Sequence, residues 1–207
     1  MADNPALRMR IITPARVLLF LFTLSYMIAG FALLSSAGNN EFLLYLVGLS
    51  PLLFLAFWAQ IHFEFPLWML WLFSILMALH LAGGSIMVHG DVLYNLVLIS
   101  IPNWTGLTIW KFDQLVHPYG AASIALISYV LLSRATSLPK VALFVIAFMV
   151  ANGAGALNEV IEFMTKISTA HSTVGGYYNT ALDLFFNTLG AALGSFLGTL
   201  YPQKSEP

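Results

Sequence analysis

Residues 141–167 read VALFVIAFMVANGAGALNEVIEFMTKI. The stretch begins as an apolar run of the kind that crosses a bilayer as a helix, which takes about 20 residues. Its later part contains Asn158, Glu159 and Glu162, and ionisable side chains within a membrane span are costly and usually functional. The stretch therefore predicts both a membrane helix and a polar site within it.

The whole chain has the composition of an integral membrane protein. Of its 207 residues, 59% are hydrophobic and 8% are charged, against about 45–50% and about 25% in soluble domains. The spans are expected to be helices, because a lipid-exposed strand edge leaves backbone groups unpaired. A formal net charge of -1 gives no electrostatic support to nucleic-acid binding. The lack of cysteine excludes disulfides and thiolate metal sites.

We predict an all-α fold, a polytopic membrane helix bundle with about six transmembrane helices. Segments rich in Gly, Pro, Ser and Asn separate the apolar runs. The predicted helices cover residues 17–34, 42–61, 67–88, 108–132, 141–167 and 180–201. At this length we expect one transmembrane domain, 1–207. Its parts are a cytoplasmic N-terminal segment (1–16), two lipid-anchoring helices (17–66), a four-helix polar-site bundle (67–201) and a tail (202–207).

The basic residues predict the orientation of the chain. An even number of helices puts both termini on one side, and most basic residues share that side: Arg8, Arg10, Arg16, Arg134, Lys140 and Lys204. Lys111 and Lys166 fall on the other side. The positive-inside rule then places both termini in the cytoplasm. A cleaved signal peptide is the alternative for the first run, although about 18 apolar residues exceed the usual 7–15 or so.

Polar side chains on four of these helices are predicted to meet in the outer half of the bilayer. Helices that alternate in direction bring the end of one to the level of the start of the next. Within each helix, Asp113 and His117, Asn158 and Glu162, and Asn179 and Asp183 are four residues apart and share a face. Small residues form two stripes: Gly190, Gly194 and Gly198, and Ala147, Ala151 and Gly155. The stripes predict that the last two helices pack closely against each other.

Imidazoles and carboxylates gathered in a helix bundle suit a divalent metal ion, Fe, Mn or Zn. The predicted ligands are His80, Asp113, His117, Glu159, Glu162 and Asp183. Three of these carboxylates, Glu159, Glu162 and Asp183, are also the candidate acid and base catalysts. Asn158, Asn179 and Asn187 are expected to support the ligands by hydrogen bonds.

Two other interpretations of the same residues remain open. A proton- or cation-coupled carrier would use the same acids, although the cytoplasmic halves of these helices are nearly all apolar. A purely structural network would explain the asparagines as interhelical contacts. It gives no reason, however, to assemble four carboxylates that repel one another in a low dielectric.

Four sequence blocks resemble a known family. They are His80-Leu-Ala-Gly-Gly, Lys111-Phe-Asp-Gln-Leu-Val-His117, Asn158-Glu-Val-Ile-Glu162-Phe and Ala181-Leu-Asp183-Leu-Phe-Phe-Asn187-Thr-Leu-Gly190-Ala191. Together they resemble the YjdF-like (DUF2238) family of bacterial inner-membrane proteins, and the last three also resemble the VanZ-like family. The resemblance implies a multi-pass protein of the bacterial inner membrane with an outward-facing polar site, and it names no substrate.

The leading hypothesis is a membrane enzyme or metal-binding protein that acts on a lipid or a cell-envelope molecule from the periplasmic side. Its expected partners are membrane lipids and a small molecule of the cell envelope, and no nucleic acid. The sequence leaves the oligomeric state open.

Overall fold

The structure, a computed structural model, describes residues 13–40, 42–44, 65–100, 110–168 and 175–201. In this part of the chain five helices are long and apolar enough to cross a membrane, which confirms the all-α membrane bundle. Beyond residue 44, the predicted helix 42–61 lies outside the described residues. The chain divides into two compact units, Met1–Ser85 and Ile86–Pro207, and each is described by itself.

The first unit contains helices α2 (Pro14–Ser36) and α4 (Leu67–Ser85). Helix α2 begins where Thr13 accepts a hydrogen bond from the backbone N–H of Arg16 at 3.4 Å, with proline at the first helical position. This combination is favoured at helix starts. The helix is followed by Gly38 at φ +64°, a left-handed conformation that costs glycine little.

Helices α2 and α4 are joined by a small polar contact. The hydroxyl oxygens of Thr23 and Ser74 are 2.7 Å apart. The Tyr26 hydroxyl donates to the Ser74 carbonyl oxygen, also at 2.7 Å. Such hydrogen bonds between helices are typical of membrane proteins. Within the first compact unit α4 packs against α2, and the predicted grouping of residues 67–88 with the polar helices that follow stays a prediction.

Two short strand pairs open the second unit, and the sequence predicted neither. The first joins β1 (Met87–Val88) to β2 (Asp91–Val92), and His89 and Gly90 between them both have positive φ. Two such residues form the turn that suits a tight hairpin. The prediction of a helix through residue 88 is therefore wrong at its end, because the chain leaves the helix after Ser85.

After the short helix η1 (Leu93–Asn95), strand β3 (Val97–Ile99) pairs antiparallel with β4 (Trp110–Lys111). The predicted helix 108–132 begins later than expected for this reason. Trp110 and Lys111 pair as a strand, and the helix itself starts at Asp113.

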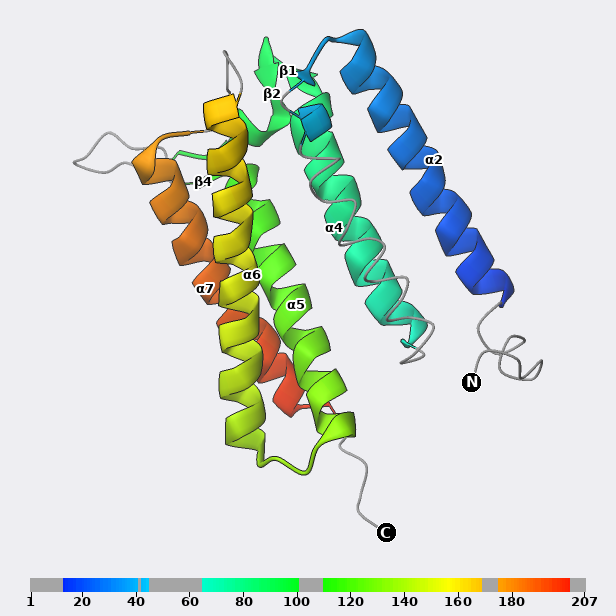
Figure 1. Cartoon of the computed structure of the whole chain (residues 1–207), viewed down its shortest axis with the longest axis vertical. Helices are drawn as coiled ribbons and strands as arrows, with labels where there is room; N and C mark the ends of the chain where they lie inside the picture. Colours follow the sequence, from blue (N-terminus) through cyan, green and yellow to red (C-terminus); the bar gives the residue numbers. More distant parts are fainter. Residues whose placement is uncertain (1–12, 41, 45–64, 101–109, 169–174, 202–207) are drawn as a thin grey trace. The chain divides into compact units, whose positions relative to one another are not determined.

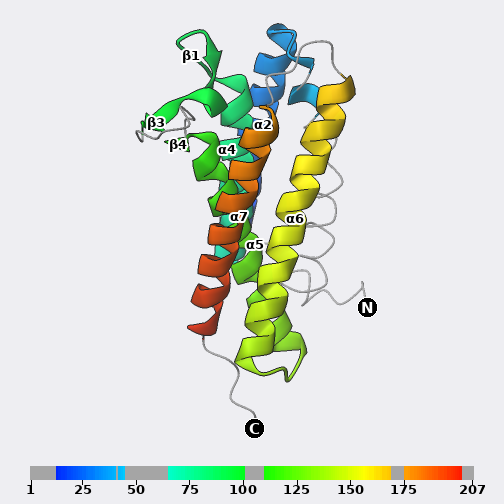
Figure 2. The same ribbon diagram turned by 90° about the vertical axis from the view of Figure 1, so that its left-hand side faces the viewer.

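Helices α5 (Asp113–Ala135), α6 (Lys140–Ser168) and α7 (Tyr177–Thr199) form the body of the second unit. They run side by side in alternating directions (Figure 1), and the view turned by 90° shows the same arrangement (Figure 2). The start of α5, the end of α6 and the start of α7 therefore lie at one end of the unit, beside the strands. The acidic residues of the three helices all lie towards this end: Asp113, Glu159, Glu162 and Asp183.

The last two helices contact each other as predicted, but the glycine stripe of α7 packs against α5 instead of α6. A Cβ atom on Gly190 would clash with the backbone of Pro118, and one on Gly194 would clash with the backbone of Ala122. The two helix backbones therefore touch, which only glycine allows. Between α6 and α7 the corresponding contact is Gly155 against the side chain of Asn187.

The end of this unit away from the strands is filled by apolar packing. One buried cluster joins small residues of all three helices, and a second is built around a buried tyrosine. The first comprises Ala121, Ala125, Ala151 and Ala191, and the second comprises Tyr129, Leu143 and Ala147. Short side chains on facing helices bring the backbones close together, so this half of the unit is densely packed.

Candidate metal centre

His117 lies at the centre of the polar cluster, and its side chain is buried. The Nε2 atom of His117 is 3.3 Å from an oxygen of Asp113, one turn earlier on α5, and 3.8 Å from an oxygen of Asp183 on α7. On the other edge of the ring, Nδ1 is 3.7 Å from an oxygen of Glu159 on α6. One imidazole therefore has carboxylates from three helices on its two sides.

The aspartate side of this cluster is well supplied with hydrogen bonds. Asp183 is fully buried and accepts from the side-chain amides of Gln114, at 2.8 Å, and Asn179, at 2.5 Å. The same Asn179 amide donates to Asp113 at 3.1 Å. Amide donors therefore hold both aspartates, and Asn179 ties α7 to α5.

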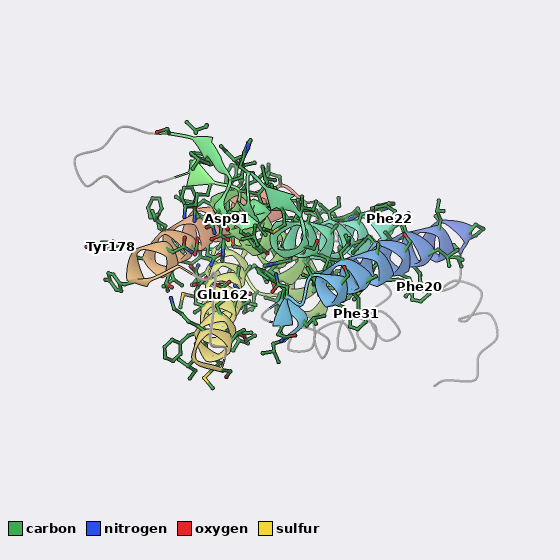
Figure 3. All side chains as sticks on the ribbon, turned by 90° about the horizontal axis from the view of Figure 1, so that it is seen from above. Phe20, Phe22, Phe31, Asp91, Glu162 and Tyr178 are labelled. Atoms are coloured by element: carbon green, nitrogen blue, oxygen red, sulfur yellow. The ribbon has the colours of Figure 1, made fainter. Side chains whose placement is uncertain are left out.

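The glutamate side is poorly supplied by comparison. Glu162 accepts a hydrogen bond from the side-chain amide of Asn158, one turn earlier on α6, at 2.7 Å. Glu159 is 7% exposed; the side chains of Asn158 and Thr180 are near its carboxylate, but among the described residues neither oxygen accepts a hydrogen bond of good geometry. A buried carboxylate without well-formed hydrogen bonds is expensive unless a cation or a proton neutralises it. Figure 3 shows Glu162 near the end of α6, on the side turned towards the bundle.

Gln114 was not among the predicted site residues, and it is fully buried beside the aspartates. Its amide group donates to Asp183, and its carbonyl oxygen accepts from the backbone N–H of Lys111 at 3.0 Å. Gln114 thus fixes the start of α5 to strand β4 on one side and to α7 on the other. Its position three residues before His117 puts both on one helix face, a signal that could have identified it.

The structure brings most of the predicted site residues together. Asp113, His117, Glu159, Glu162 and Asp183 form two overlapping groups that share His117, and in each group the possible ligand atoms lie within 4.8 Å of one another. One group is Asp113, His117 and Asp183, and the other is His117, Glu159 and Glu162. Either group offers the imidazole and carboxylate ligands that divalent transition metals accept.

The remaining predicted residues have different surroundings. Asn158 and Asn179 make the expected hydrogen bonds to carboxylates. Asn187 is buried against Gly155, and its side-chain nitrogen has no hydrogen-bond partner among the described residues. His80 is half-buried on α4 in the first unit, so its membership of the centre stays a prediction.

Comparison with known proteins identifies a family but no characterised relative. The family described as "Predicted membrane protein (DUF2238)" matches residues 14–204. No curated protein and no solved structure matches the chain, and the resemblance to the VanZ-like family gains no support. Because the match extends over nearly the whole chain, including all the described helices, the protein belongs to the DUF2238 family of membrane proteins.

Proposed function

We propose that this membrane protein binds a divalent cation through His117, Glu159 and Glu162, and acts as a metal-dependent enzyme on a lipid or cell-envelope molecule. The observation that carries the proposal is the buried Glu159 carboxylate, which lies 3.7 Å from His117 Nδ1 and, among the described residues, accepts no hydrogen bond of good geometry although the side chains of Asn158 and Thr180 are near it. Two ligands of one cation at about 2.1 Å each lie about 3–3.5 Å apart. A small contraction of this group therefore accommodates an ion.

The hydrogen bonds favour the glutamate side over the aspartate side as the cation site. Metal-binding histidines commonly donate one ring N–H to a carboxylate, which orients the other nitrogen towards the metal. His117 Nε2, 3.3 Å from Asp113, fits the first role, and Nδ1 then faces Glu159. Asp113 and Asp183 already accept amide hydrogen bonds, so we assign them to orienting the histidine. Of the six ligands expected from the sequence, this proposal keeps three as cation ligands: His117, Glu159 and Glu162.

The length of the helices supports a site at the level of the lipid head groups. A helix rising 1.5 Å per residue crosses a hydrocarbon core of about 30 Å in about 20 residues. At the far end of the unit, Lys140 on α6 donates to the carbonyl of Thr199 on α7 at 3.3 Å, which pairs these two helices there. About 20 residues from that end lie Glu159 on α6 and Asn179 on α7. The cluster is then within reach of a head group.

The packing of the unit favours an enzyme over a carrier. A carrier needs a polar route from the site to the opposite side of the membrane. In the second unit, the half of the three helices away from the strands contains the alanine cluster and the cluster around Tyr129. These clusters are apolar and offer no such route. A cation held at one boundary, by contrast, polarises a substrate group and activates a water molecule.

Cation binding is the first test of this proposal. We expect protein purified in detergent without chelator to bind about one equivalent of Mn²⁺ or Zn²⁺, measured by calorimetry and elemental analysis. Glu159→Gln is expected to weaken binding at least about tenfold, because it removes a charged ligand from a buried site. The cation is also expected to raise the melting temperature of the wild type, since it binds the folded state only.

The matched control is Asp91→Asn in the β1–β2 hairpin. Asp91 is exposed, and an asparagine keeps the oxygen that accepts from the Val92 N–H at 2.7 Å. This variant should bind the cation as the wild type does. Equal binding by the wild type and Glu159→Gln would refute the assignment of the ligand, and no binding by the wild type would refute the metal centre itself.

The orientation of the protein is tested separately with single cysteines, which the natural sequence lacks. Ser137 lies between α5 and α6, flanked by Arg134 and Lys140, and Ser100 follows β3 near the opposite end of these helices; both are exposed. By the positive-inside rule, a cysteine at 137 should react only from the cytoplasm and one at 100 only from outside. The reverse labelling pattern would put the centre on the cytoplasmic side.

A further inference from the structure

Strand β3 exposes apolar side chains on both of its faces. Its three residues, Val97, Leu98 and Ile99, are 46%, 42% and 54% exposed. Successive side chains of a strand point to opposite faces, and an antiparallel strand with one face in water alternates between apolar and polar residues. Strand β3 shows no such alternation. A contiguous exposed apolar surface marks contact with a partner or a membrane.

A ring contact places this strand pair along the membrane-spanning part of α7. Ile99 pairs with Trp110 of β4, and the Trp110 ring centroid is 5.5 Å from that of Phe186 on α7. Phe186 comes seven residues after Asn179, which at 1.5 Å per residue puts it about 10 Å further along the helix. Figures 1 and 2 both show β4 beside the first turns of α7. The two strands therefore lie level with a membrane helix, not beyond its end.

The side chains of β4 suit the boundary between lipid and water. Trp110 contacts α7, while the next residue, Lys111, donates from Nζ to Asn95 Oδ1 in η1 at 3.5 Å. Tryptophan is enriched at membrane–water interfaces, and lysine reaches from apolar surroundings to polar partners there. In the described part of the chain β3 pairs with β4 alone. The other edge of β3 therefore needs polar partners, which lipid head groups supply and the hydrocarbon core does not.

We propose that the β3–β4 ribbon, Val97–Ile99 with Trp110–Lys111, binds phospholipid at the level of the glycerol groups, on the same side of the membrane as the polar cluster. The occupant follows from continuity with the lipid-facing surface of α7. Phe185 of α7 is 57% exposed, and its ring centroid lies 5.6 Å from that of Phe186, which in turn contacts Trp110. One apolar surface thus runs from the membrane helix to the ribbon. Lipid binding at the ribbon does not depend on the proposed cation.

The ribbon is also connected to the polar cluster by two hydrogen bonds. The backbone N–H of Lys111 donates to Gln114 Oε1 at 3.0 Å, and the Gln114 amide donates to Asp183 at 2.8 Å. A phospholipid bound at the ribbon is therefore held beside the start of α5, where the polar cluster begins.

The test uses single cysteines, which the natural sequence lacks. Leu98→Cys and Val97→Cys replace exposed side chains and so remove little packing. Each variant carries an environment-sensitive fluorescent label and is placed in nanodiscs of phosphatidylethanolamine and phosphatidylglycerol. The quenchers are lipids with a nitroxide near the glycerol end or near the methyl end of the chain, and iodide in the water. We expect both labels to lose most fluorescence to the nitroxide near the glycerol end, and little to iodide.

Two other positions calibrate the quenchers. Met149 on α6 is 61% exposed and lies about 14 Å along the helix from Lys140, so a label on Met149→Cys should be quenched best by the nitroxide near the methyl end. Ser137 is exposed between α5 and α6, and a label on Ser137→Cys should be quenched by iodide.

Two results would overturn the inference. If iodide quenches the labels at 97 and 98 as strongly as the label at 137, and the nitroxide lipids do not, the ribbon lies in water. If neither quencher reaches these labels, protein covers the strand instead of lipid. Oxidation of unlabelled Leu98→Cys would then show whether the cover is a second copy of the chain, because a disulfide would join the two copies.

Discussion

Replacing Asp183 by alanine is expected to lower the free energy of unfolding by about 3–5 kcal/mol, the range found when one partner of a buried charged pair is removed. Asp183 is fully buried and accepts amide hydrogen bonds from Gln114 on α5 and from Asn179 on α7. It also faces His117 at 3.8 Å. The alanine would remove the nearer acceptor of both amides, leaving each only its longer hydrogen bond to Asp113, and would take one carboxylate away from the buried His117.

The measurement is a double-mutant cycle of Asp183→Ala and Gln114→Ala, with unfolding followed in mixed detergent micelles. We expect the two effects to be strongly non-additive, well above the 0.3–0.5 kcal/mol or so seen for independent sites. Removing both partners leaves fewer buried groups unsatisfied than removing one. Additive effects would mean that the hydrogen bond between them contributes nothing to stability. The hydrogen bonds link Asp183 to Gln114 and Glu162 to Asn158.

The second large effect is expected at the contact between α5 and α7. Gly194→Ala should lower the free energy of unfolding by about 3 kcal/mol, at the upper end of the range for overpacked sites. The added methyl group meets the backbone of Ala122, and a backbone cannot move aside as a flexible side chain can. The helices must separate, which also loosens the packing of Gly190 against Pro118.

Gly153→Ala on α6 is the matched control for this substitution. Within the described part of the chain, no atom of a neighbouring segment lies within 4 Å of the Cβ position at Gly153. Alanine there is expected to change the unfolding free energy by at most about 1 kcal/mol, in the stabilising direction, because alanine favours a helix more than glycine does. If the two variants unfold alike in the same detergent, the close approach of α5 and α7 is incorrect.

The local geometry of the centre was predictable because helix periodicity alone determines it. Asp113 and His117, Asn158 and Glu162, and Asn179 and Asp183 were each expected on one face. In each pair the side chains are in contact, at 3.3, 2.7 and 2.5 Å. Residues four apart in a helix are neighbours whatever the rest of the chain does. The amino-acid composition predicted the membrane helices equally well, because an apolar run of this length can satisfy its backbone groups in a membrane only as a helix or a closed barrel.

The partner of each helix face was not predictable, because it depends on contacts between distant parts of the chain. Glycine spacing showed that α7 has a flat face, but the choice of α5 over α6 as its neighbour follows from the packing of three helices. The strand pairs were missed for a similar reason. Trp110 and Lys111 belong to a strand because β3 lies beside them, and their own sequence continues the pattern of the helix that follows.

The sequence by itself thus determined that the chain forms membrane helices and which polar side chains share a helix face, because lipid and helix geometry act on each segment alone. The tertiary structure decided that His117 is the common neighbour of the carboxylates, and that Gln114 and Asn179 hold the aspartates. It also placed Glu159 in a buried position facing His117, where its oxygens accept no hydrogen bond of good geometry among the described residues. These relations join three helices, and only the packing of backbones brings their side chains within bonding distance.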